Sequence, residues 1–592
     1  LNSVSVSSAF FRYCRVLLPF ACALALPSTL AAQTAASVPS RQSHYQSGLA
    51  AWQSGDLKSA RASFEAVVKL NPRDSDAQNA LAQVLLQQGE VAAAIPHFRT
   101  VTRLKPSLAI GHVYLGQALS LSGDRENAIT ELRTGVRLAP QQSEAHEALA
   151  RVLSAHGDDQ EAQSEMRRAV DLAPKRPELH DALGSLLAQQ KEYPEAETQF
   201  RTALQLDSQY QPALLHLGVT LLDSGKTQDA KQLLTQALQV NPEDGRAHFY
   251  LGAILEAEHD SAGALREYEA ASRLSPNLAV ARMRLGLLAQ RAGDTASAIA
   301  SFRAVIAMQP EDAEAHNNLG LALLQTGDVD NAIQKFQQAL ALAPRDSSFR
   351  NNLGAAYLEK ADFDEAIRQY REGLTIAPGN AELHYNLGLA YKLKDDIPAA
   401  LEELRKTIAL DPSLPDPHYT IGVTLWQSGK FEESAKELNE VIRLKPDYAE
   451  AYYTLGTVYK QAGDLPKAAS ALRKAIELQP DFAGAHTTLA AVLSRQGDAQ
   501  AAAAERKLGA ELIQEKMTLQ TATFATNSGT KLMNAGDLDG AILQFESAIK
   551  ADSSYAPAHQ QLATALERKG DRDRATKELE TFRRLQKKSS AH

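Results

Sequence analysis

The chain has 592 residues, of which 44% are hydrophobic, 22% charged and 6% aromatic, and its formal net charge is −9. A mean hydropathy of −0.30 excludes a protein built of many membrane spans, and the acidic balance lacks the basic footprint of a nucleic-acid-binding protein. Two cysteines are too few for a disulfide framework or a cysteine-based zinc module. The composition leaves a large Ala-rich and Leu-rich protein of globular or repeat architecture.

Residues 1–32 have the pattern of a secretory signal peptide. Arg12 and Arg15 precede an apolar run at 16–26, and small residues follow it. This run of ~11 residues is shorter than the ~20 that a membrane-spanning helix needs. We therefore expect export to a periplasmic or secreted location, with residues 33–40 as a short linker. A retained N-terminal segment that anchors the chain to the membrane is the alternative.

From residue 41 onward the sequence repeats with a period of 34 residues. Fourteen units occupy residues 41–516, and the last of them, 483–516, is degenerate. A five-residue insertion at 517–521 follows, then two terminal units at 522–589 and a tail at 590–592. Proline recurs at one position of the unit: Pro72, Pro106, Pro140, Pro174, Pro242, Pro276, Pro310, Pro344, Pro378, Pro412, Pro446 and Pro480.

Each unit is expected to fold as two helices. Positions 4, 7, 8 and 11 of the unit form an apolar stripe with helical spacing, and positions 20, 24 and 27 form a second. Small residues at positions 8 and 20 allow the two helices to approach closely. Gly-Asp at positions 15 and 16 ends the first helix and caps the second, and Pro at position 32 ends the second. We predict about 80% helix and no strands, far above the average content of globular proteins.

The unit resembles the tetratricopeptide repeat, whose pattern is clearest in the unit that begins at residue 313. That unit carries Leu319, Gly320, Leu323, Gly327, Asp328, Ala332, Phe336, Ala339 and Pro344. The resemblance covers residues 41–589. It implies an all-α fold, namely a right-handed α-α superhelix, or solenoid, of about 16 tetratricopeptide helix pairs that share one continuous core.

The degenerate unit departs from this pattern in its second helix. Arg506 and Gly509 stand at two of its core positions, and no proline ends it. We expect this helix to run on past Met517, with a kink or flexible joint at 517–521 that leaves 522–589 as a small terminal pair of units.

The repeats leave no stretch long enough for a catalytic domain. A glycine-rich phosphate loop, H-E-x-x-H and G-x-S-x-G are all absent from the sequence. We therefore predict that the protein is not an enzyme and has no catalytic residue, metal site or cofactor.

Ten of the fifteen histidines stand at position 4 of a unit: His44, His112, His146, His180, His248, His316, His384, His418, His486 and His559. Packed helices lie 8–10 Å apart, so histidines in successive units cannot converge on one zinc ion, whose ligands lie at ~2.0–2.1 Å. We interpret them as packed residues of the apolar stripe. A weaker hypothesis is that acidification charges them and loosens the array.

Candidate binding residues lie in five consecutive units. In the tetratricopeptide family the first helices line the concave face, and positions 2, 5, 6, 9, 12 and 13 point into it. The candidates at these positions are Asn317, Asn318, Asn351, Asn352, Tyr385, Asn386, Tyr419, Tyr453, Lys392, Trp426 and Lys460. Asn at position 6 resembles the asparagine ladder in the superhelical repeats of O-linked N-acetylglucosamine transferase, whose catalytic domain has no counterpart here.

That resemblance implies that the asparagines hold the backbone of an extended client, while tyrosines add rigid amphipathic contact area. We therefore expect a non-enzymatic scaffold that binds extended protein segments in the concave groove. Its expected partners are proteins or peptides, without nucleic acid and without a membrane span after signal cleavage. The alternative is a structural or assembly component of a cell-envelope machine, as in polysaccharide export, pilus assembly or outer-membrane assembly.

Overall fold

The computed structural model describes residues 41–589, so the expected signal peptide and linker at 1–40 and the tail at 590–592 lie outside the described residues. Within the described range the chain forms 31 helices and no strand, and 82% of these described residues are helical. The predicted all-α solenoid of tetratricopeptide helix pairs is confirmed. No helix in this range is both long and apolar enough to cross a membrane.

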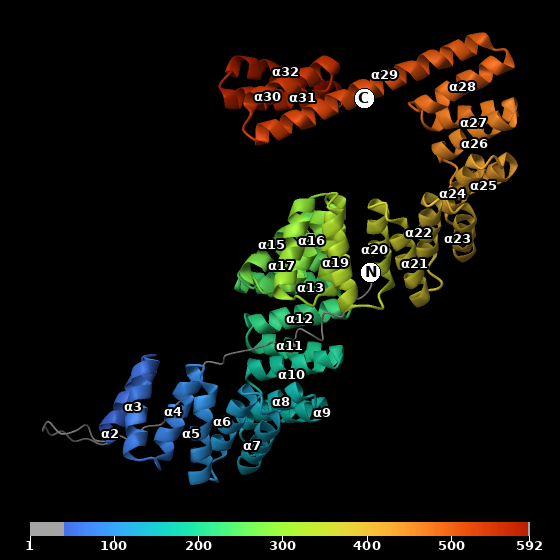
Figure 1. Cartoon of the computed structure of the whole chain (residues 1–592). Helices are drawn as coiled ribbons and strands as arrows, with labels where there is room; N and C mark the ends of the chain where they lie inside the picture. The colour runs from blue at the N-terminus through green and yellow to red at the C-terminus, as the bar shows by residue number, and fades with distance from the viewer. Residues whose placement is uncertain (1–40, 590–592) are drawn as a thin grey trace. The chain divides into compact units, whose positions relative to one another are not determined.

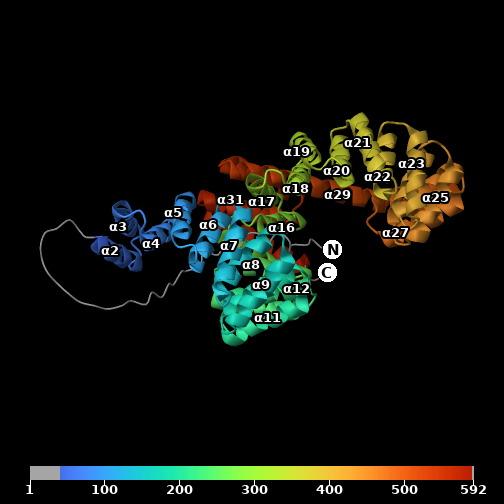
Figure 2. The same ribbon diagram turned by 90° about the horizontal axis from the view of Figure 1, so that it is seen from below.

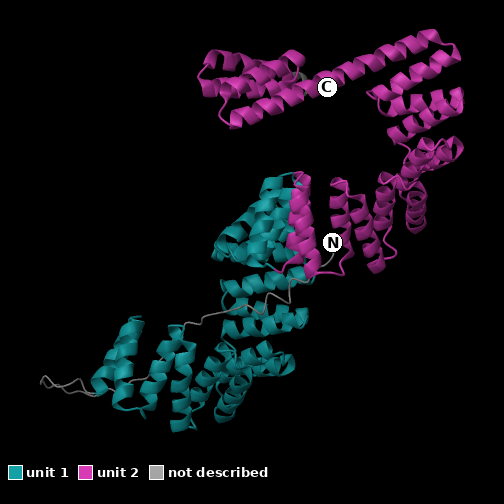
Figure 3. Ribbon diagram, in the orientation of Figure 1, with its two compact units in different colours: residues 1–310 teal, residues 311–592 magenta. Residues whose placement is uncertain are grey.

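The chain divides into two compact units, up to Pro310 and from Glu311 onward (Figure 3). Within each unit, antiparallel helices pair and the pairs stack in chain order (Figures 1 and 2). The helices of unit 1 are α2 (Arg41–Gln53), α3 (Leu57–Leu70), α4 (Ser75–Gln87), α5 (Val91–Leu104), α6 (Ala109–Leu121), α7 (Arg125–Leu138), α8 (Ser143–His156), α9 (Asp159–Leu172), α10 (Pro177–Gln189), α11 (Tyr193–Leu206), α12 (Gln211–Asp223), α13 (Thr227–Val240), α14 (Gly245–Ala257), α15 (Ser261–Leu274), α16 (Ala279–Arg291) and α17 (Thr295–Met308).

Unit 2 continues the same pattern of alternating first and second helices. Its helices are α18 (Ala313–Gln325), α19 (Val329–Leu342), α20 (Ser347–Glu359), α21 (Phe363–Ile376), α22 (Ala381–Leu393), α23 (Ile397–Leu410), α24 (Pro415–Gln427), α25 (Phe431–Leu444), α26 (Ala449–Ala462), α27 (Leu465–Leu478), α28 (Ala483–Gln496), α29 (Ala499–Asn534), α30 (Leu538–Ala551), α31 (Ala556–Lys569) and α32 (Arg572–Ser589).

The turn between the two helices of a pair has the geometry that Gly-Asp favours. Gly55 has a φ of 79°, in the left-handed region, and the Asp56 carboxylate accepts the backbone N–H of Ser59 at the start of α3. Where glycine is missing at this position the left-handed conformation persists, for example at Lys191 and at Ala361 with a φ of 60°. Such residues carry strain, because a side chain disfavours this region.

Close contact between paired helices depends on the small residues at positions 8 and 20. A Cβ atom added to Gly320 would lie 2.7 Å from the ring of Phe336, so this ring packs directly on the glycine backbone. Phe336 is fully buried, and so is Ala332 at position 20 of the same unit. The same arrangement recurs along the chain, with fully buried position-24 rings at Phe64, Phe98, Phe200, Phe302 and Phe545.

The histidines at position 4 are more than packed residues. In His146 the ring Nδ1 lies 2.5 Å from the Glu165 carboxylate on the second helix of the pair, and Nε2 lies 3.2 Å from the Pro140 carbonyl oxygen. One ring therefore joins both helices of its own pair to the end of the preceding pair. Because both oxygens only accept hydrogen bonds, the doubly protonated ring satisfies both contacts.

This contact, which we call the His–Glu staple, occurs in seven units with Nδ1 to carboxylate distances of 2.5–2.6 Å. Its members are His112–Glu131, His146–Glu165, His248–Glu267, His384–Glu403, His418–Glu437, His486–Glu505 and His559–Glu578. In these units the ring therefore packs in the apolar stripe and also holds a carboxylate of the second helix, a contact that the interpretation as packed residues does not include.

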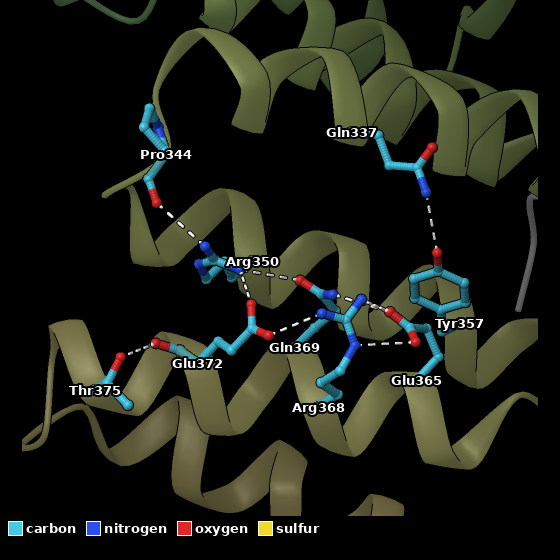
Figure 4. A network of polar contacts seen from close by, with 9 residues as sticks. All are labelled: Gln337, Pro344, Arg350, Tyr357, Glu365, Arg368, Gln369, Glu372 and Thr375. Carbon is cyan, nitrogen blue, oxygen red and sulfur yellow. Dashed lines mark hydrogen bonds and ion pairs between the residues drawn. The ribbon is translucent and has the colours of Figure 1, made fainter.

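The unit that begins at residue 347 replaces this histidine by Arg350. Its guanidinium donates to the Pro344 carbonyl oxygen at 3.3 Å and to Gln369 Oε1 at 3.3 Å, and it forms an ion pair with Glu372 (Figure 4). The longer side chain thus reaches the same carbonyl and the same second helix as the staple does. Position 4 links successive helix pairs even where the residue type changes.

The second helix of the degenerate unit runs into the first helix of the next one. Residues 499–534 form the single helix α29, so the chain continues past Met517 as a helix, as expected, and the insertion at 517–521 lies within it. The reason is local, because residues 510–521 contain neither Pro nor Gly. Between the buried residues Gly509 and Ala522 no side chain of α29 is buried.

Candidate protein-binding surface

The eleven candidate residues all lie on first helices of unit 2, namely α18, α20, α22, α24 and α26. We call the surface that they form the first-helix surface: Asn317, Asn318, Asn351, Asn352, Tyr385, Asn386, Tyr419 and Tyr453 at positions 5 and 6, and Lys392, Trp426 and Lys460 at position 12. Ten of them are partly exposed, whereas the side chain of Asn317 is buried, with 7% exposure.

Successive helices of this surface are joined by side chains 35 residues apart. Asn352 Nδ2 on α20 donates to Asn317 Oδ1 on α18 at 2.9 Å, and Asn386 Nδ2 on α22 donates to Asn351 Oδ1 on α20 at 2.8 Å. In both pairs position 6 of one helix meets position 5 of the preceding first helix. The asparagines are thus brought together as a line of amide pairs across three helices.

The same line continues with hydroxyl groups. The Tyr385 hydroxyl lies 3.5 Å from Thr420 Oγ1, and the Tyr419 hydroxyl lies 3.3 Å from Thr454 Oγ1. The two threonines were not among the candidates, although they stand at position 6 after a position-5 tyrosine. A search for residue pairs 35 apart could have found them.

Two aromatic contacts widen the surface at its tyrosine end. The Tyr419 ring stacks on Tyr448, with ring centres 5.3 Å apart and planes at 26°, and Tyr453 lies against Phe482 with ring centres 4.7 Å apart. Tyr448 and Phe482 are not among the candidate residues either. Both are the last residue of their unit, so the aromatic side chain at position 34 was the available signal.

The position-12 residues lie two helical turns further along the same helices. Trp426 Nε1 donates to Gln461 Oε1 at 2.8 Å, which again links α24 to α26. Burial lowers the pKa of the Lys392 ammonium, since no ion pair in the described part of the chain offsets its desolvation. Lys460 is partly exposed and its carbonyl oxygen accepts from Arg495.

The chemistry available on the first-helix surface is that of recognition. Each amide pair uses one N–H and one oxygen, so Asn352 and Asn386 each retain a second N–H and an amide oxygen for a ligand. Among the described residues no group of three or more His, Cys, Asp or Glu is placed to hold a metal ion. The surface therefore offers neutral hydrogen-bonding groups, aromatic rings and two lysines.

The repeats also match known protein families. One tetratricopeptide repeat family model matches residues 45–109, 115–177 and 148–211, and another matches 187–253 and 221–290. The chain belongs to the tetratricopeptide repeat family. The model of the cilia and flagella-associated protein 70 C-terminal domain matches residues 288–522. Membership in this repeat family supports a role as a protein-interaction scaffold.

Solved structures give further similarities. MamA is 31% identical over 28% of this chain and 96% of its own, with a TM-score of 0.27. A chain of the APC/C hetero-tetramer Cut9–Hcn1 is 15% identical over 89% of this chain and 96% of its own, with a TM-score of 0.37. YrrB, described as a TPR protein with an unusual peptide-binding site, is 26% identical over 31% of this chain and 95% of its own, with a TM-score of 0.27. No curated protein matches the chain.

Proposed function

We propose that the protein is a non-enzymatic scaffold whose first-helix surface binds an extended segment of another protein. The observation that carries this proposal is the line of side-chain pairs that runs from Asn317 on α18 to Thr454 on α26. Asn317, Thr420 and Thr454 are buried members of this line. Its partly exposed members on the three middle helices α20, α22 and α24 present amide and hydroxyl groups that a chain crossing these helices would meet: Asn351, Asn352, Tyr385, Asn386 and Tyr419.

The spacing of this line suits an extended backbone. Neighbouring packed helices are about 8–10 Å apart, and an extended chain advances about 3.3 Å per residue, so one helix corresponds to about three residues of ligand. The amide pairing fixes the orientation of Asn352 and Asn386, which lowers the entropy lost on binding. An amide that both donates and accepts can pair with any peptide bond, so we expect backbone recognition with weak sequence preference in this part of the surface.

The test is peptide binding by asparagine variants. Twelve-residue peptides selected from a random display library against the full chain would be labelled and titrated by fluorescence anisotropy. We expect the double variant Asn352→Ala/Asn386→Ala to bind about tenfold more weakly, as two hydrogen bonds of about 0.5–1.5 kcal/mol each are lost.

Asn527→Ala is the matched control, because Asn527 stands at position 6 of its unit but outside the first-helix surface, and it should bind as the unmodified chain does. Replacing single peptide bonds of the ligand by esters should weaken binding at about every third residue. Unchanged affinity of the double variant, or no effect of any ester, would show that these asparagines do not hold a peptide backbone.

The second candidate is a component of a cell-envelope assembly, favoured by the basic and apolar pattern of residues 1–32. We propose on the same basis that the protein is exported. Fractionation of host cells tests both points, since an exported protein is recovered outside the cytoplasm with a shortened N-terminus. Co-purification with an envelope complex after crosslinking would support the assembly role, and recovery of full-length protein from the cytoplasm would refute export.

A further inference from the structure

The tyrosine half of the first-helix surface, on α22, α24 and α26, carries acidic residues that the asparagine helix α20 lacks. In each of these three helices position 2 is a carboxylate and position 5, one helical turn later, is a tyrosine: Glu382 and Tyr385, Asp416 and Tyr419, and Glu450 and Tyr453. The three carboxylate side chains are exposed. Residues three apart lie on the same side of a helix, so each carboxylate accompanies its tyrosine along the surface.

These carboxylates lack cationic partners. Among the described residues Asp416 and Glu450 form no ion pair, and Glu382 accepts only a hydrogen bond from Asn351 at 2.9 Å. Burial, and then the nearby negative charge of Asp416 and of Glu450, raises the pKa of the Tyr448 hydroxyl. The carboxylates and the rings therefore form one connected acidic and aromatic patch.

A lysine of the chain itself shows how this patch receives a cation. Lys445 Nζ lies 4.7 Å from the ring centre of Tyr448, which in turn stacks on Tyr419. An ammonium over an aromatic face within about 6 Å is attracted by the ring electrons. Similar contacts in the described residues join Arg371 to Tyr391 and Lys467 to Tyr459. Basic side chains thus already pack on rings in this part of unit 2.

We infer that the tyrosine half of the first-helix surface selects an extended protein segment rich in lysine or arginine, with one basic side chain at about every third residue. The stem of each basic residue would cover a tyrosine ring, and its charge would lie beside the carboxylate one turn away. The three-residue spacing follows from the helix separation of about 8–10 Å and the advance of about 3.3 Å per residue. This inference rests on the proposed function, because it assigns the ligand of the same surface.

The lysines at position 12 do not repel a basic segment bound along positions 2 and 5. Position 12 is ten residues from position 2, which is about 15 Å along a helix axis. Lys392 and Lys460 therefore lie beyond the Debye length of about 8–10 Å from the carboxylates of their own helices at physiological salt. A basic segment that follows the line of positions 2 and 5 avoids them.

The test compares four labelled twelve-residue peptides on the full chain by fluorescence anisotropy. They are a repeat of Lys-Ser-Gly, the same repeat with Gln or with Glu in place of Lys, and a peptide of the first composition with its four lysines in one block. A cation–ring contact is worth about 0.5–1 kcal/mol and an exposed ion pair about 0.2–1 kcal/mol, so three such sites predict at least tenfold tighter binding of the Lys repeat than of the Gln repeat. The Glu repeat should bind most weakly, and the block peptide at least threefold more weakly than the Lys repeat.

The double variant Asp416→Asn/Glu450→Gln keeps shape and removes charge, and it should reduce the preference for Lys over Gln to threefold or less. Glu314→Gln is the matched control: Glu314 is an exposed position-2 carboxylate, but asparagine follows it at position 5, so the preference should be unchanged. Equal binding of the Lys and Gln repeats, an undiminished preference in the double variant, or loss of the preference in the control would overturn the inference.

Failure of this inference is distinguishable from failure of the proposed function. If all repeats bind alike and Asn352→Ala/Asn386→Ala weakens them all, backbone binding stands and the basic preference is refuted. If no peptide binds, both are refuted. If the Lys repeat binds through Asp416 and Glu450 but is unaffected by the asparagine variant, the basic preference stands and the role of the asparagines is refuted.

Discussion

Replacing the carboxylate of one His–Glu staple should destabilise its helix pair without changing its shape. In the staple of α8 and α9, the side chain of His146 is 7% exposed and that of Glu165 23% exposed, and the two are 2.5 Å apart. Glu165→Gln keeps an acceptor at this distance but removes its charge. A hydrogen bond to a charged group contributes about 1.5–3 kcal/mol and a neutral one about 0.5–1.5 kcal/mol, so we expect a loss of about 1 kcal/mol.

Hydrogen exchange followed by mass spectrometry is the suitable assay, because stability in a repeat array is local. A loss of about 1 kcal/mol corresponds to about fivefold faster exchange of amides in α8 and α9, with α2 and α3 unaffected. The neighbouring helix pair, α10 and α11, provides a control in which the substitution adds a charge and should stabilise the pair. There His180 contacts Gln199 at 2.8 Å, and Gln199→Glu should slow exchange in α10 and α11.

This experiment distinguishes two roles of the histidines, namely packing alone and the charged contact of the His–Glu staple. If they act only by packing, His146→Ala speeds exchange while Glu165→Gln and Gln199→Glu have no effect. That outcome would refute the staple. If both charge-changing variants shift exchange in opposite directions, the charge of the pair contributes to the stability of the array.

Three other substitutions and one control test the packing, the turns and the partly buried Lys392. Gly320→Ala should destabilise by about 1–3 kcal/mol because the new Cβ meets the Phe336 ring at 2.7 Å, whereas Gly379→Ala, with no atom within 4 Å, should be neutral in thermal melts. Ala361→Gly should stabilise by about 0.5–1 kcal/mol by relieving a φ of 60°, and a lower urea midpoint would contradict this. Lys392→Met should raise the melting temperature at pH 7, because it removes a charged group whose pKa is lowered in the folded chain. The charged Lys392 destabilises the folded chain fully at a pH below its folded pKa. This destabilisation fades as the pH rises toward the unfolded pKa of about 10.4, since the unfolded chain binds more protons in this range. A gain that stayed constant from pH 7 to 10 would contradict the assigned cause.

The helical repeat fold could be predicted because its signals are local. Gly55-Asp56 ends one helix and caps the next within a few residues, and Pro72 ends the second in the same way. The continuous helix α29 was partly foreseen for the same reason, since no stop residue follows Met517. The helix runs through the insertion at 517–521, which contains no Pro or Gly to end it, and the kink or flexible joint expected there stays a prediction.

The contacts between repeats could not be predicted so readily, because they join residues that are far apart in sequence. His146 and Glu165 are 19 residues apart and meet only when two helices pair, so the sequence pattern alone indicates a packed residue of the apolar stripe. Asn352 and Asn317 are 35 residues apart and meet only when two pairs stack. Their positions on the repeat pointed to the right surface, but not to the amide pair that orients them.

Helix α29 has a consequence for how the chain folds and unfolds. Its 36 residues span about 54 Å, and the buried side chains of its two ends belong to separate cores, Ala502 with α28 and Ala522 with α30 and α31. Nearest-neighbour cooperativity requires shared buried surface, which is missing between Gly509 and Ala522. Heat or denaturant should therefore melt the C-terminal part of α29 together with α30, α31 and α32 in a transition of their own, and a single cut after Lys516 should release a fragment that keeps these helices.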